Sequence, residues 1–456
     1  PPTRTLKRKK FPTHTTFTGG INIMKRFISF IFVFVLLIAT VPQATATSGD
    51  NPLNLFTPDM TDAKFAEAVT TTNITSSALP SVTPFWTDLV DTENIENNGE
   101  GVYVAVLDTG LVPQWPFFFS QANIAWDLGK GFSHDIYWDD TSGLMIGDLR
   151  DDRGFITDLA SGHGTHVTST VVGFNVNNSF WVDGVAPKAT IIPVLVLDAW
   201  EVDTPSGTLQ LSGGTDAMIA AGINYIADLA PTLDGPVVIN MSLGGPTPSA
   251  EIEAAVDNAI AQGVVVVASA GNNGSDGMGY PGGLEQIISA GAGGWASMFL
   301  NGWTGDVPEK LNMGDELGNN WQTYLEDFSS RPNKDLDQKH QDLDVTAPGA
   351  WIVGPYKSAF ANDLDYYYLS GTSMASPHVA GMAALILQDN PDIEQSKMEF
   401  ILKKAAKGDP LPADDAIVAF PFEEPYFYTA TWDGGDYGSG FLQADQALNA
   451  AGKFVK

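Results

Sequence analysis

The sequence predicts an α/β fold with a mostly parallel central sheet and helices on both faces. Continuous apolar runs rich in β-branched residues recur along the chain and indicate strands buried on both sides. Segments of helical periodicity separate some of these runs, and a repeated strand–helix–strand order requires a parallel sheet. In such sheets ligands bind beyond the carboxyl ends of the strands. The runs expected to form strands are 102–107, 190–197, 236–241 and 264–268.

Three helices are expected around the later strands. The first covers 215–226, where three isoleucines fall in phase on one side. In the second, Thr247 is the expected cap, Pro248 suits the first turn, and Gly263 closes the helix. A third, apolar helix is expected over 379–387. These helices supply the layers that a buried parallel sheet needs.

Composition excludes several classes of protein. The 456 residues are 44% hydrophobic and 17% charged, which is typical of a globular chain and excludes a disordered one. A formal net charge of −31 argues against a nucleic-acid or anionic-membrane partner. Cys is absent, so disulfides and thiolate zinc sites are excluded, and a bound metal would need oxygen ligands.

The N-terminal segments have the pattern of an export signal rather than of a folded domain. Residues 1–23 precede Met24 and are expected to be a non-structural leader. Residues 24–46 combine a basic start, an apolar run over 27–41 and a small-residue cleavage site, which predicts a signal peptide and a secreted protein. If 27–41 were retained, the protein would be anchored at the cell surface. Residues 47–81 are polar and read as a short pro-segment or spacer.

Three segments of the body contain candidate catalytic residues. Asp108 ends the first expected strand within Asp-Thr-Gly, and His163 lies in Ser-Gly-His-Gly-Thr-His-Val. Ser373 stands before Pro377 and the apolar helix, and Gly371 lets the chain turn into that helix. The Ser373 hydroxyl is therefore expected near the positive end of a helix dipole. Taken alone, each segment has a simpler interpretation, such as a turn, a solvated loop or a packed helix.

These residue types suit nucleophilic catalysis. A serine hydroxyl needs a base to take its proton, and an imidazole does so best when a buried carboxylate fixes its tautomer. Acyl transfer also needs a donor for the oxygen that becomes negative. Asn272, which follows the strand 264–268, is the candidate for that donor. His166 could instead ligate a metal and His378 could pack in a helix; neither is assigned a catalytic role.

The Asp108, His163 and Ser373 segments, their order, and the position of Asn272 resemble the subtilisin-like serine proteases, or subtilases. The resemblance runs from about residue 85 to 451. It implies a three-layer fold with a mostly parallel central sheet, formed by a single peptidase domain over 82–456. Within that domain, 136–158 and 291–344 are expected to be surface insertions.

The resemblance implies a role for each site residue. Ser373 attacks the scissile carbonyl, His163 is the general base, and Asp108 orients His163. Asn272 and the Ser373 amide hold the oxyanion. Gly279 would form the floor of the pocket for the P1 residue, the residue before the cleaved bond, and a glycine floor predicts large apolar or aromatic P1 residues. Asp276 nearby could instead favour basic ones. The residues expected to bind substrate are Ser242, Leu243, Gly244, Ala270, Gly271 and Gly279.

No cofactor is expected for the chemistry, and calcium is expected as a structural ion. Asn178 lies where the family has a calcium loop, and the acidic stretches 139–140 and 148–152 offer further oxygens or are simply solvated. The expected partners are protein or peptide substrates, with no nucleic acid, and a membrane only if the signal is retained. The chain is expected to be a monomer. The pro-segment is short for the folded pro-domain of secreted subtilases.

Two other functions remain open at this point. A catalytically silent, subtilase-like binding scaffold usually lacks a member of the triad, whereas all three residues are present here. A lipase or esterase would carry Gly-x-Ser-x-Gly on an earlier turn with the acid and the histidine after the serine, and in this chain the serine comes last.

Overall fold

The computed structural model describes residues 79–298, 303, 323–406, 411, 415–419 and 427–452. All of them belong to one of two compact units, residues 33–456; the other unit, 1–32, lies outside the described residues. The expected leader, the signal peptide and nearly all of the pro-segment also lie outside them, as does much of the expected insertion over 291–344.

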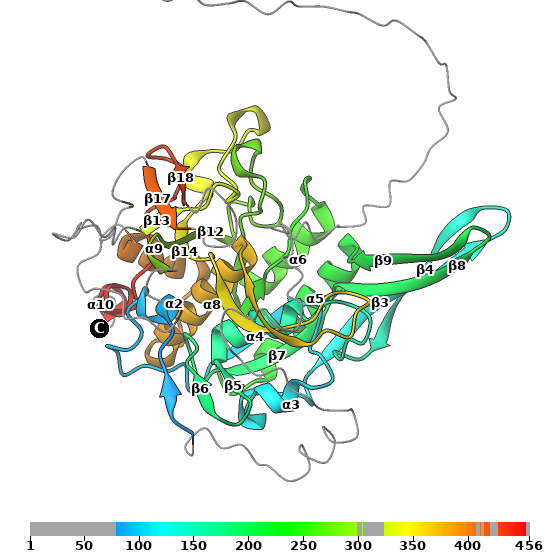
Figure 1. Cartoon of the computed structure of the whole chain (residues 1–456), viewed down its shortest axis with the longest axis horizontal. Helices are drawn as coiled ribbons and strands as arrows, with labels where there is room; N and C mark the ends of the chain where they lie inside the picture. The colour runs from blue at the N-terminus through cyan, green and yellow to red at the C-terminus, as the bar shows by residue number, and fades with distance from the viewer. Residues whose placement is uncertain are drawn as a thin grey trace, which may run out of the picture. The chain divides into compact units, whose positions relative to one another are not determined.

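A nine-stranded sheet forms the centre of the described fold (Figure 1). Its neighbours follow the order β13-β12-β11-β10-β2-β7-β3-β4, and β14 also pairs with β12. The five neighbouring pairs from β12 to β3 are parallel, as is the β12–β14 pair, whereas β13 and β4 pair antiparallel. The strands are β2 (Tyr103–Asp108), β3 (Lys130–Asp139), β4 (Gly143–Arg153), β7 (Thr190–Leu195), β10 (Val237–Met241), β11 (Val265–Ser269), β12 (Ile288–Trp295), β13 (Thr323–Leu325) and β14 (Val345–Pro348).

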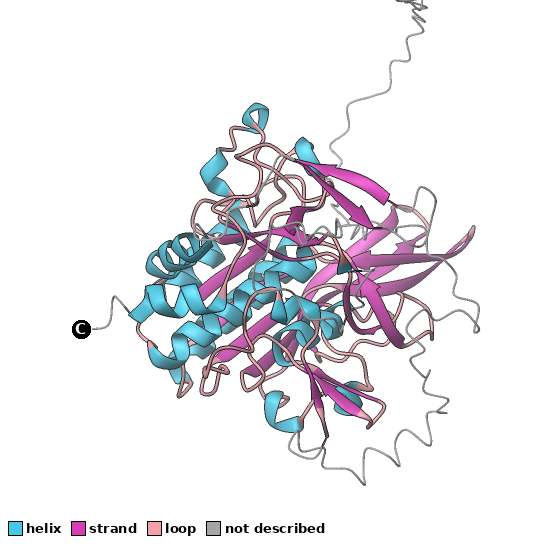
Figure 2. Ribbon diagram, turned by 60° about the vertical axis from the view of Figure 1, so that its left-hand side comes forward, coloured by secondary structure: helices cyan, strands magenta, loops and turns pink. Residues whose placement is uncertain are grey.

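Helices cover both faces of this sheet and make a three-layer α/β fold (Figure 2). Alternate residues of β2 show how the layers are separated, because Val104 and Val106 pack with one hydrophobic cluster and Ala105 and Leu107 with the other. The first cluster contains α4 (His163–Val172), α8 (Thr372–Asp389), α9 (Gln395–Ala406) and α10 (Ala444–Gly452). The second contains α5 (Asp216–Leu229) and α6 (Ala250–Ala261). The predicted fold class is confirmed.

Helix starts differ from the sequence-based expectations in two places. Helix α5 begins next to Thr215, as expected, and the Thr215 hydroxyl caps it by accepting from the Met218 amide at 3.2 Å. In α6 the cap is Ser249, which accepts from the amide of Ile252, so the expectation that Thr247 caps this helix is wrong. Helix α8 begins at Thr372 rather than near 379, and Pro377 lies inside it.

Two long hairpins extend side by side from the edge of the sheet, as β3 with β4 and β8 (Asp198–Thr204) with β9 (Gly207–Gly213) show in Figure 1. The expected insertion over 136–158 is therefore largely a β-hairpin, and the second hairpin was not predicted. The expected insertion over 291–344 begins inside β12, where Trp295 is buried, and it also contains buried β13. These parts belong to the core rather than to the surface.

Smaller elements complete the described fold. A three-stranded sheet has the order β1-β6-β5, and two further hairpins pair β15 with β16 and β17 with β18. None of the helices in the described ranges is both long and apolar enough to cross a membrane. The remaining elements are β1 (Ser81–Val82), α2 (Phe85–Asp88), α3 (Trp115–Phe118), β5 (Phe174–Val176), β6 (Phe180–Val182), β15 (Ile352–Tyr356), β16 (Asp365–Leu369), β17 (Asp415–Ala419) and β18 (Phe427–Thr431).

Candidate active site

The predicted acid and base meet at the carboxyl end of the sheet. Asp108 is the last residue of β2 and His163 is the first residue of α4. His163 Nδ1 lies 2.8 Å from Asp108 Oδ1 and 2.9 Å from Oδ2, and both side chains are buried. Since a carboxylate oxygen only accepts, Nδ1 carries the proton and Nε2 of a neutral imidazole is left as the acceptor. This is the tautomer that a general base needs.

Thr109 and Gly164 fix this contact. The Thr109 hydroxyl donates to the carbonyl of Ser161 at 2.9 Å and accepts from the amide of Gly164 at 2.9 Å, which ties the end of β2 to the start of α4. A Cβ at position 164 would lie 2.4 Å from the Gly110 carbonyl oxygen and 3.2 Å from Asp108 Oδ1. Only glycine allows the helix to start this close to the carboxylate.

Ser373 lies in the first turn of α8, where a network of buried polar side chains holds its carbonyl. In a regular helix that carbonyl would accept from the amide of residue 377, but Pro377 has no N–H. The Ser242 hydroxyl donates to the Ser373 carbonyl instead, at 2.7 Å. Ser242 in turn accepts from Asn240 Nδ2 at 3.0 Å, and Asn240 Oδ1 accepts from the Ser376 hydroxyl at 2.7 Å. The Ser373 hydroxyl donates to the Ser242 carbonyl at 3.1 Å.

Asn272 lies beyond the end of β11, and its side-chain oxygen is engaged by the start of α8. Asn272 Oδ1 accepts from the Thr372 amide at 2.9 Å and from the Thr372 hydroxyl at 3.0 Å. Both oxygen contacts fix the orientation of the amide, which leaves the Nδ2 donors on the opposite side. Helix geometry gives the amide of Ser373 no internal partner, because the first N–H groups of a helix lack one.

One cavity of about 250 Å³ joins these residues. It contains His163, Ser373 and Asn272 together with four of the residues expected to bind substrate, Leu243, Gly244, Gly271 and Gly279. Ser242 and Ala270 are fully buried and do not line it; Ser242 supports Ser373 from behind. Asp276 is exposed and is not part of the lining either. The remaining lining residues were not expected from the sequence; they are Gly245, Pro246, Ser269, Asn273, Leu369, Ser370, Gly371, Thr372 and Met374.

Gly279 lines the cavity between two segments that form its walls, one at Gly271 and the other at Gly245. Its amide donates to the Ala270 carbonyl at 2.8 Å, and the next residue, Tyr280, exchanges two 2.8 Å main-chain hydrogen bonds with Gly245. A Cβ at position 279 would lie 3.4 Å from the Gly245 carbonyl oxygen and 3.8 Å from Gly271 Cα, in ordinary contact with both walls. A larger side chain at this position would therefore fill space that is now open.

The other two histidines of the motifs are structural. His166 Nε2 lies 3.1 Å from the Ile352 carbonyl oxygen, and His378 Nδ1 lies 2.8 Å from that of Met374. Burial, with a smaller contribution from neighbouring His163, lowers the pKa of His166 to about 3, and burial lowers the pKa of His378 to about 4. Both side chains are thus neutral at physiological pH.

The side chains of the predicted calcium loop are hydrogen-bonded to one another in the described structure. Asn178 Oδ1 accepts from Asn175 Nδ2 at 3.0 Å, and the Asn178 amide donates back to Asn175 Oδ1 at 3.1 Å. No group of three or more His, Asp or Glu side chains that could hold a metal occurs in the described part of the chain. The loop is thus closed by amide pairs and lacks the carboxylates that calcium prefers. Calcium at Asn178 stays a prediction.

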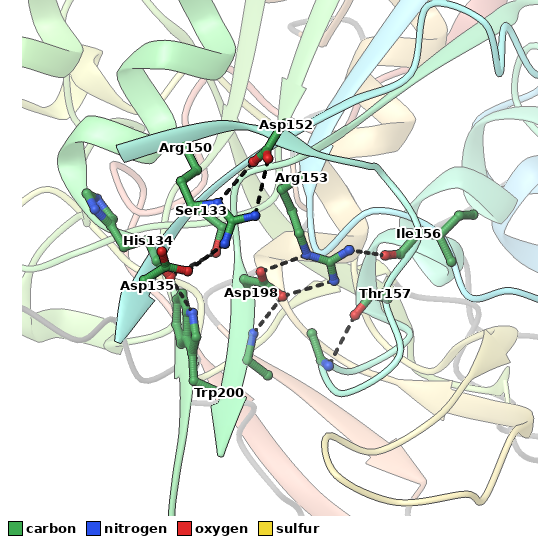
Figure 3. Close-up of polar contacts among 12 residues, drawn as sticks. Ser133, His134, Asp135, Arg150, Asp152, Arg153, Ile156, Thr157, Asp198 and Trp200 are labelled. Atoms are coloured by element: carbon green, nitrogen blue, oxygen red, sulfur yellow. Dashed lines mark hydrogen bonds and ion pairs between the residues drawn. The ribbon is translucent and has the colours of Figure 1, made fainter. Parts of the chain in front are cut away.

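An ion pair that the sequence did not indicate lies near the end of β2. Arg153 ends β4 and Asp198 begins β8, and Arg153 Nε lies 3.1 Å from the buried Asp198 Oδ2 (Figure 3). Arg153 also donates to the Ile156 carbonyl at 2.9 Å. The amides of Val196 and Leu197, just before Asp198, both donate to the Asp108 carbonyl. The pair therefore fastens the base of both hairpins next to the end of β2.

Comparisons with known proteins identify the family of this chain. The model of the subtilase family matches residues 99–422. M-protease of Shouchella clausii (strain KSM-K16) is 31% identical over 310 residues, which span 68% of this chain and 60% of that protein. Subtilisin Savinase of Lederbergia lenta is 31% identical over 308 residues, 68% of this chain and 84% of the relative.

Solved structures give the same result. S41 psychrophilic protease is 28% identical with a TM-score of 0.54, and the match covers 80% of this chain and 99% of that one. Sphericase is 25% identical with a TM-score of 0.53, covering 79% and 97%. Because the family model spans well over half of the chain, and the relatives and structures agree with it, this chain belongs to the subtilase family of serine endopeptidases.

Proposed function

We propose that this chain is a secreted serine endopeptidase that hydrolyses peptide bonds through an acyl-enzyme on Ser373. The observation that carries the proposal is the buried hydrogen bond between Asp108 and His163 at the edge of a cavity that also contains Ser373 and Asn272. A carboxylate, an imidazole and a hydroxyl around one open site are the set that acyl transfer requires.

The steps follow from the positions of the donors. Ser373 Oγ turns from the Ser242 carbonyl and attacks the scissile carbonyl carbon while His163 Nε2 takes its proton. The oxygen of the tetrahedral intermediate accepts from Asn272 Nδ2 and the Ser373 amide. His163 then gives the proton to the leaving amine, and the C–N bond breaks. Water repeats the sequence on the ester, and Ser373 recovers its proton.

Asp108 contributes by holding His163 rather than by taking a proton. Its buried carboxylate fixes the tautomer in which Nε2 is unprotonated and stabilises the imidazolium that forms. A protonated His163 cannot accept the hydroxyl proton, so activity is expected to rise from acid to neutral and alkaline pH.

The cavity favours large apolar or aromatic P1 residues. Gly279 leaves its end open, the exposed Asp276 carboxylate does not line it, and Leu243 and Met374 supply apolar surface. Asp276 is therefore the weaker basis for specificity. The substrates proposed are proteins or peptides, and the enzyme is proposed to act as a monomer.

Export and ion binding are proposed on sequence alone. The tripartite pattern of 24–46 supports secretion, with surface anchoring if the apolar run is retained. Subtilases need no cofactor for catalysis. A structural calcium ion remains the proposal for the Asn178 loop, and a chelator would lower the melting temperature of the protein if it is correct.

The proposal is tested with purified protein on casein and on a chromogenic peptide with Phe at P1. We expect hydrolysis, and we expect a fluorophosphonate probe to label Ser373. The Ser373→Ala variant should neither cleave nor be labelled. Full activity of that variant would overturn the mechanism, and a folded wild-type protein without activity or labelling would favour the silent binding scaffold.

A further inference from the structure

A single buried side chain holds the rear of the pocket floor. Gln338 Oε1 accepts from the Met278 amide at 2.8 Å, and Gln338 Nε2 donates to the Met278 carbonyl at 2.8 Å. One primary amide thus satisfies both main-chain groups of Met278, as a neighbouring strand would. Gln338 Oε1 also accepts from the Asn333 amide at 3.1 Å, and Gln338 is only 4% exposed.

Met278 immediately precedes the floor residue Gly279. The next two residues bind the pocket walls, since Gly279 donates to Ala270 and Tyr280 pairs with Gly245. Residues 278–280 are therefore held from both sides, by the walls in front and by Gln338 behind. The segment that carries Gln338 adds further support, because Asn333 Nδ2 donates to the carbonyls of Ser275 and Asp276.

We propose that Gln338 is a positioning residue that sets selectivity for the P1 side chain by fixing the depth of the pocket at Gly279. The inference rests on the proposed function, in which this cavity accepts the P1 residue. Because Gln338 lies behind Met278 and outside the cavity lining, it acts through the backbone of the floor and touches no substrate. A floor that can shift by a few tenths of an ångström no longer discriminates a large P1 side chain from a small one.

The chain contains a matched control with the same chemistry elsewhere. Gln395 Oε1 accepts from the Val266 amide at 2.8 Å, and Gln395 Nε2 donates to the Val266 carbonyl at 3.0 Å and to that of Gln286 at 2.8 Å. Gln395 is buried to a similar degree, and neither it nor Val266 lines the cavity. A Gln395 variant loses the same kind of side-chain to main-chain hydrogen bonds while the support of Gly279 stays intact, so it measures the effect of that loss alone.

The experiment compares Gln338→Met with Gln395→Met on two peptides that differ only in Phe or Ala at P1. We expect Gln338→Met to lower the ratio of kcat/KM for Phe over Ala about tenfold, with kcat/KM for Ala nearly unchanged. Gln395→Met should leave the ratio at its wild-type value. An unchanged ratio in Gln338→Met, or an equal fall in Gln395→Met, would overturn the proposal.

A second variant tests the hydrogen bonds themselves. In Gln338→Glu the protonated carboxyl can accept from the Met278 amide and donate to its carbonyl, whereas the ionised carboxylate cannot donate. We expect near-wild-type selectivity at about pH 5.5 and a Gln338→Met-like ratio at about pH 9, since burial raises the pKa of a carboxyl. The ratio cancels the ionisation of His163, which both substrates share. A ratio independent of pH would overturn the role of the clamp.

Failure of the inference is distinguishable from failure of the proposed function. If wild-type protein does not prefer Phe over Ala, the proposed P1 pocket is wrong. If it does prefer Phe and Gln338→Met keeps that preference, only the role of Gln338 is wrong. Should Gln338→Met not fold, the two pH arms of Gln338→Glu decide the question, because they compare one folded protein with itself.

Discussion

The support behind Ser373 can be tested by removing the Ser242 hydroxyl. This hydroxyl donates 2.7 Å to the Ser373 carbonyl and accepts 3.0 Å from Asn240 Nδ2, and all three residues are buried. Pro377 cannot supply the usual helical donor to the same carbonyl. In Ser242→Ala the carbonyl therefore loses its side-chain donor, and Asn240 Nδ2 loses its acceptor.

The expected loss of stability in Ser242→Ala follows from the cost of burying the Ser373 carbonyl and the Asn240 amide without their partner. A buried polar group without a partner costs about 1–3 kcal/mol, so we expect the free energy of unfolding to fall by about 2 kcal/mol. A shift of the first turn of α8 also displaces the Ser373 hydroxyl. Each ~1.4 kcal/mol of lost transition-state stabilisation is tenfold in rate, so we expect kcat to fall on the order of tenfold at unchanged KM.

A second substitution should reverse the effect. Pro377→Ala restores an N–H at the position that donates to the Ser373 carbonyl in a regular helix. By itself it costs about 0.4–1 kcal/mol through the greater freedom of the unfolded chain. Combined with Ser242→Ala, it should return part of the lost stability, with a coupling free energy of about 1 kcal/mol.

Urea unfolding measures these stabilities in a Ser373→Ala background, which prevents self-digestion, and steady-state kinetics on the active variants measures kcat. If the two changes simply add, the argument that Ser242 substitutes for the missing Pro377 N–H is refuted.

Three further predictions use other parts of the structure. Burial raises the pKa of Glu326 from 4.5 to about 7, which favours the neutral carboxyl in the folded state; this stabilisation is complete below pH 4.5 and is lost as the pH rises through 7. Glu326→Gln should remove a pH-dependent change on the order of 3 kcal/mol from urea unfolding over that window. Gly279→Val should lower kcat/KM for Phe at P1 at least about tenfold while sparing Ala, as peptide kinetics would show. Arg153→Met leaves buried Asp198 without its cation and should lower the free energy of unfolding by about 3 kcal/mol, with kcat reduced through Asp108.

Specific results would contradict two of these predictions, those for Glu326 and Arg153. In Glu326→Gln, the free energy of unfolding should lose the part of its pH dependence between pH 4.5 and 7 that comes from this carboxyl. If the variant keeps the wild-type slope of unfolding free energy against pH, Glu326 is not buried as a neutral carboxyl. Arg150 is the control for Arg153, since it pairs with Asp135 and Asp152 on the exposed part of the same hairpin (Figure 3). Arg150→Met should change neither stability nor kcat measurably. Equal effects of the two arginine variants would contradict a special role for the buried pair.

The fold class was predictable because its signals are local. Runs such as 264–268 are apolar throughout, and only a strand buried on both faces needs that composition. The hairpins were harder to predict, because β4 has three apolar residues in a row, Leu144, Met145 and Ile146, followed by Gly147 and mostly charged residues, and so shows no alternating β pattern. The Arg153–Asp198 ion pair joins that hairpin to β8 across 45 residues of sequence, and no local pattern encodes it.

The candidate site also contains residues that the sequence predicts and residues that it does not. Asp108, His163 and Ser373 could be named from their motifs, since each requires a distinctive residue type in a distinctive local setting. The residues that hold them could not be named. Gln338 and Met278 are 60 residues apart. Nothing in the neighbouring sequence distinguishes a glutamine that hydrogen-bonds to a buried main chain from one that faces water. Only the folded chain brings their donors and acceptors together.

The start of α8 shows why these supports should act together rather than separately. Thr372 is bound to Asn272, the Ser373 carbonyl is bound to Ser242, and both contacts end on neighbouring residues of one helical turn. A movement of that turn therefore changes the nucleophile and the orientation of the oxyanion donor at once. Removal of the Thr372 hydroxyl and of the Ser242 hydroxyl perturbs the same turn, so their effects on kcat should be smaller together than the product of the single effects. If the fall in kcat of the double variant equals the product of the two single falls, the turn is rigid and each contact serves only its own partner.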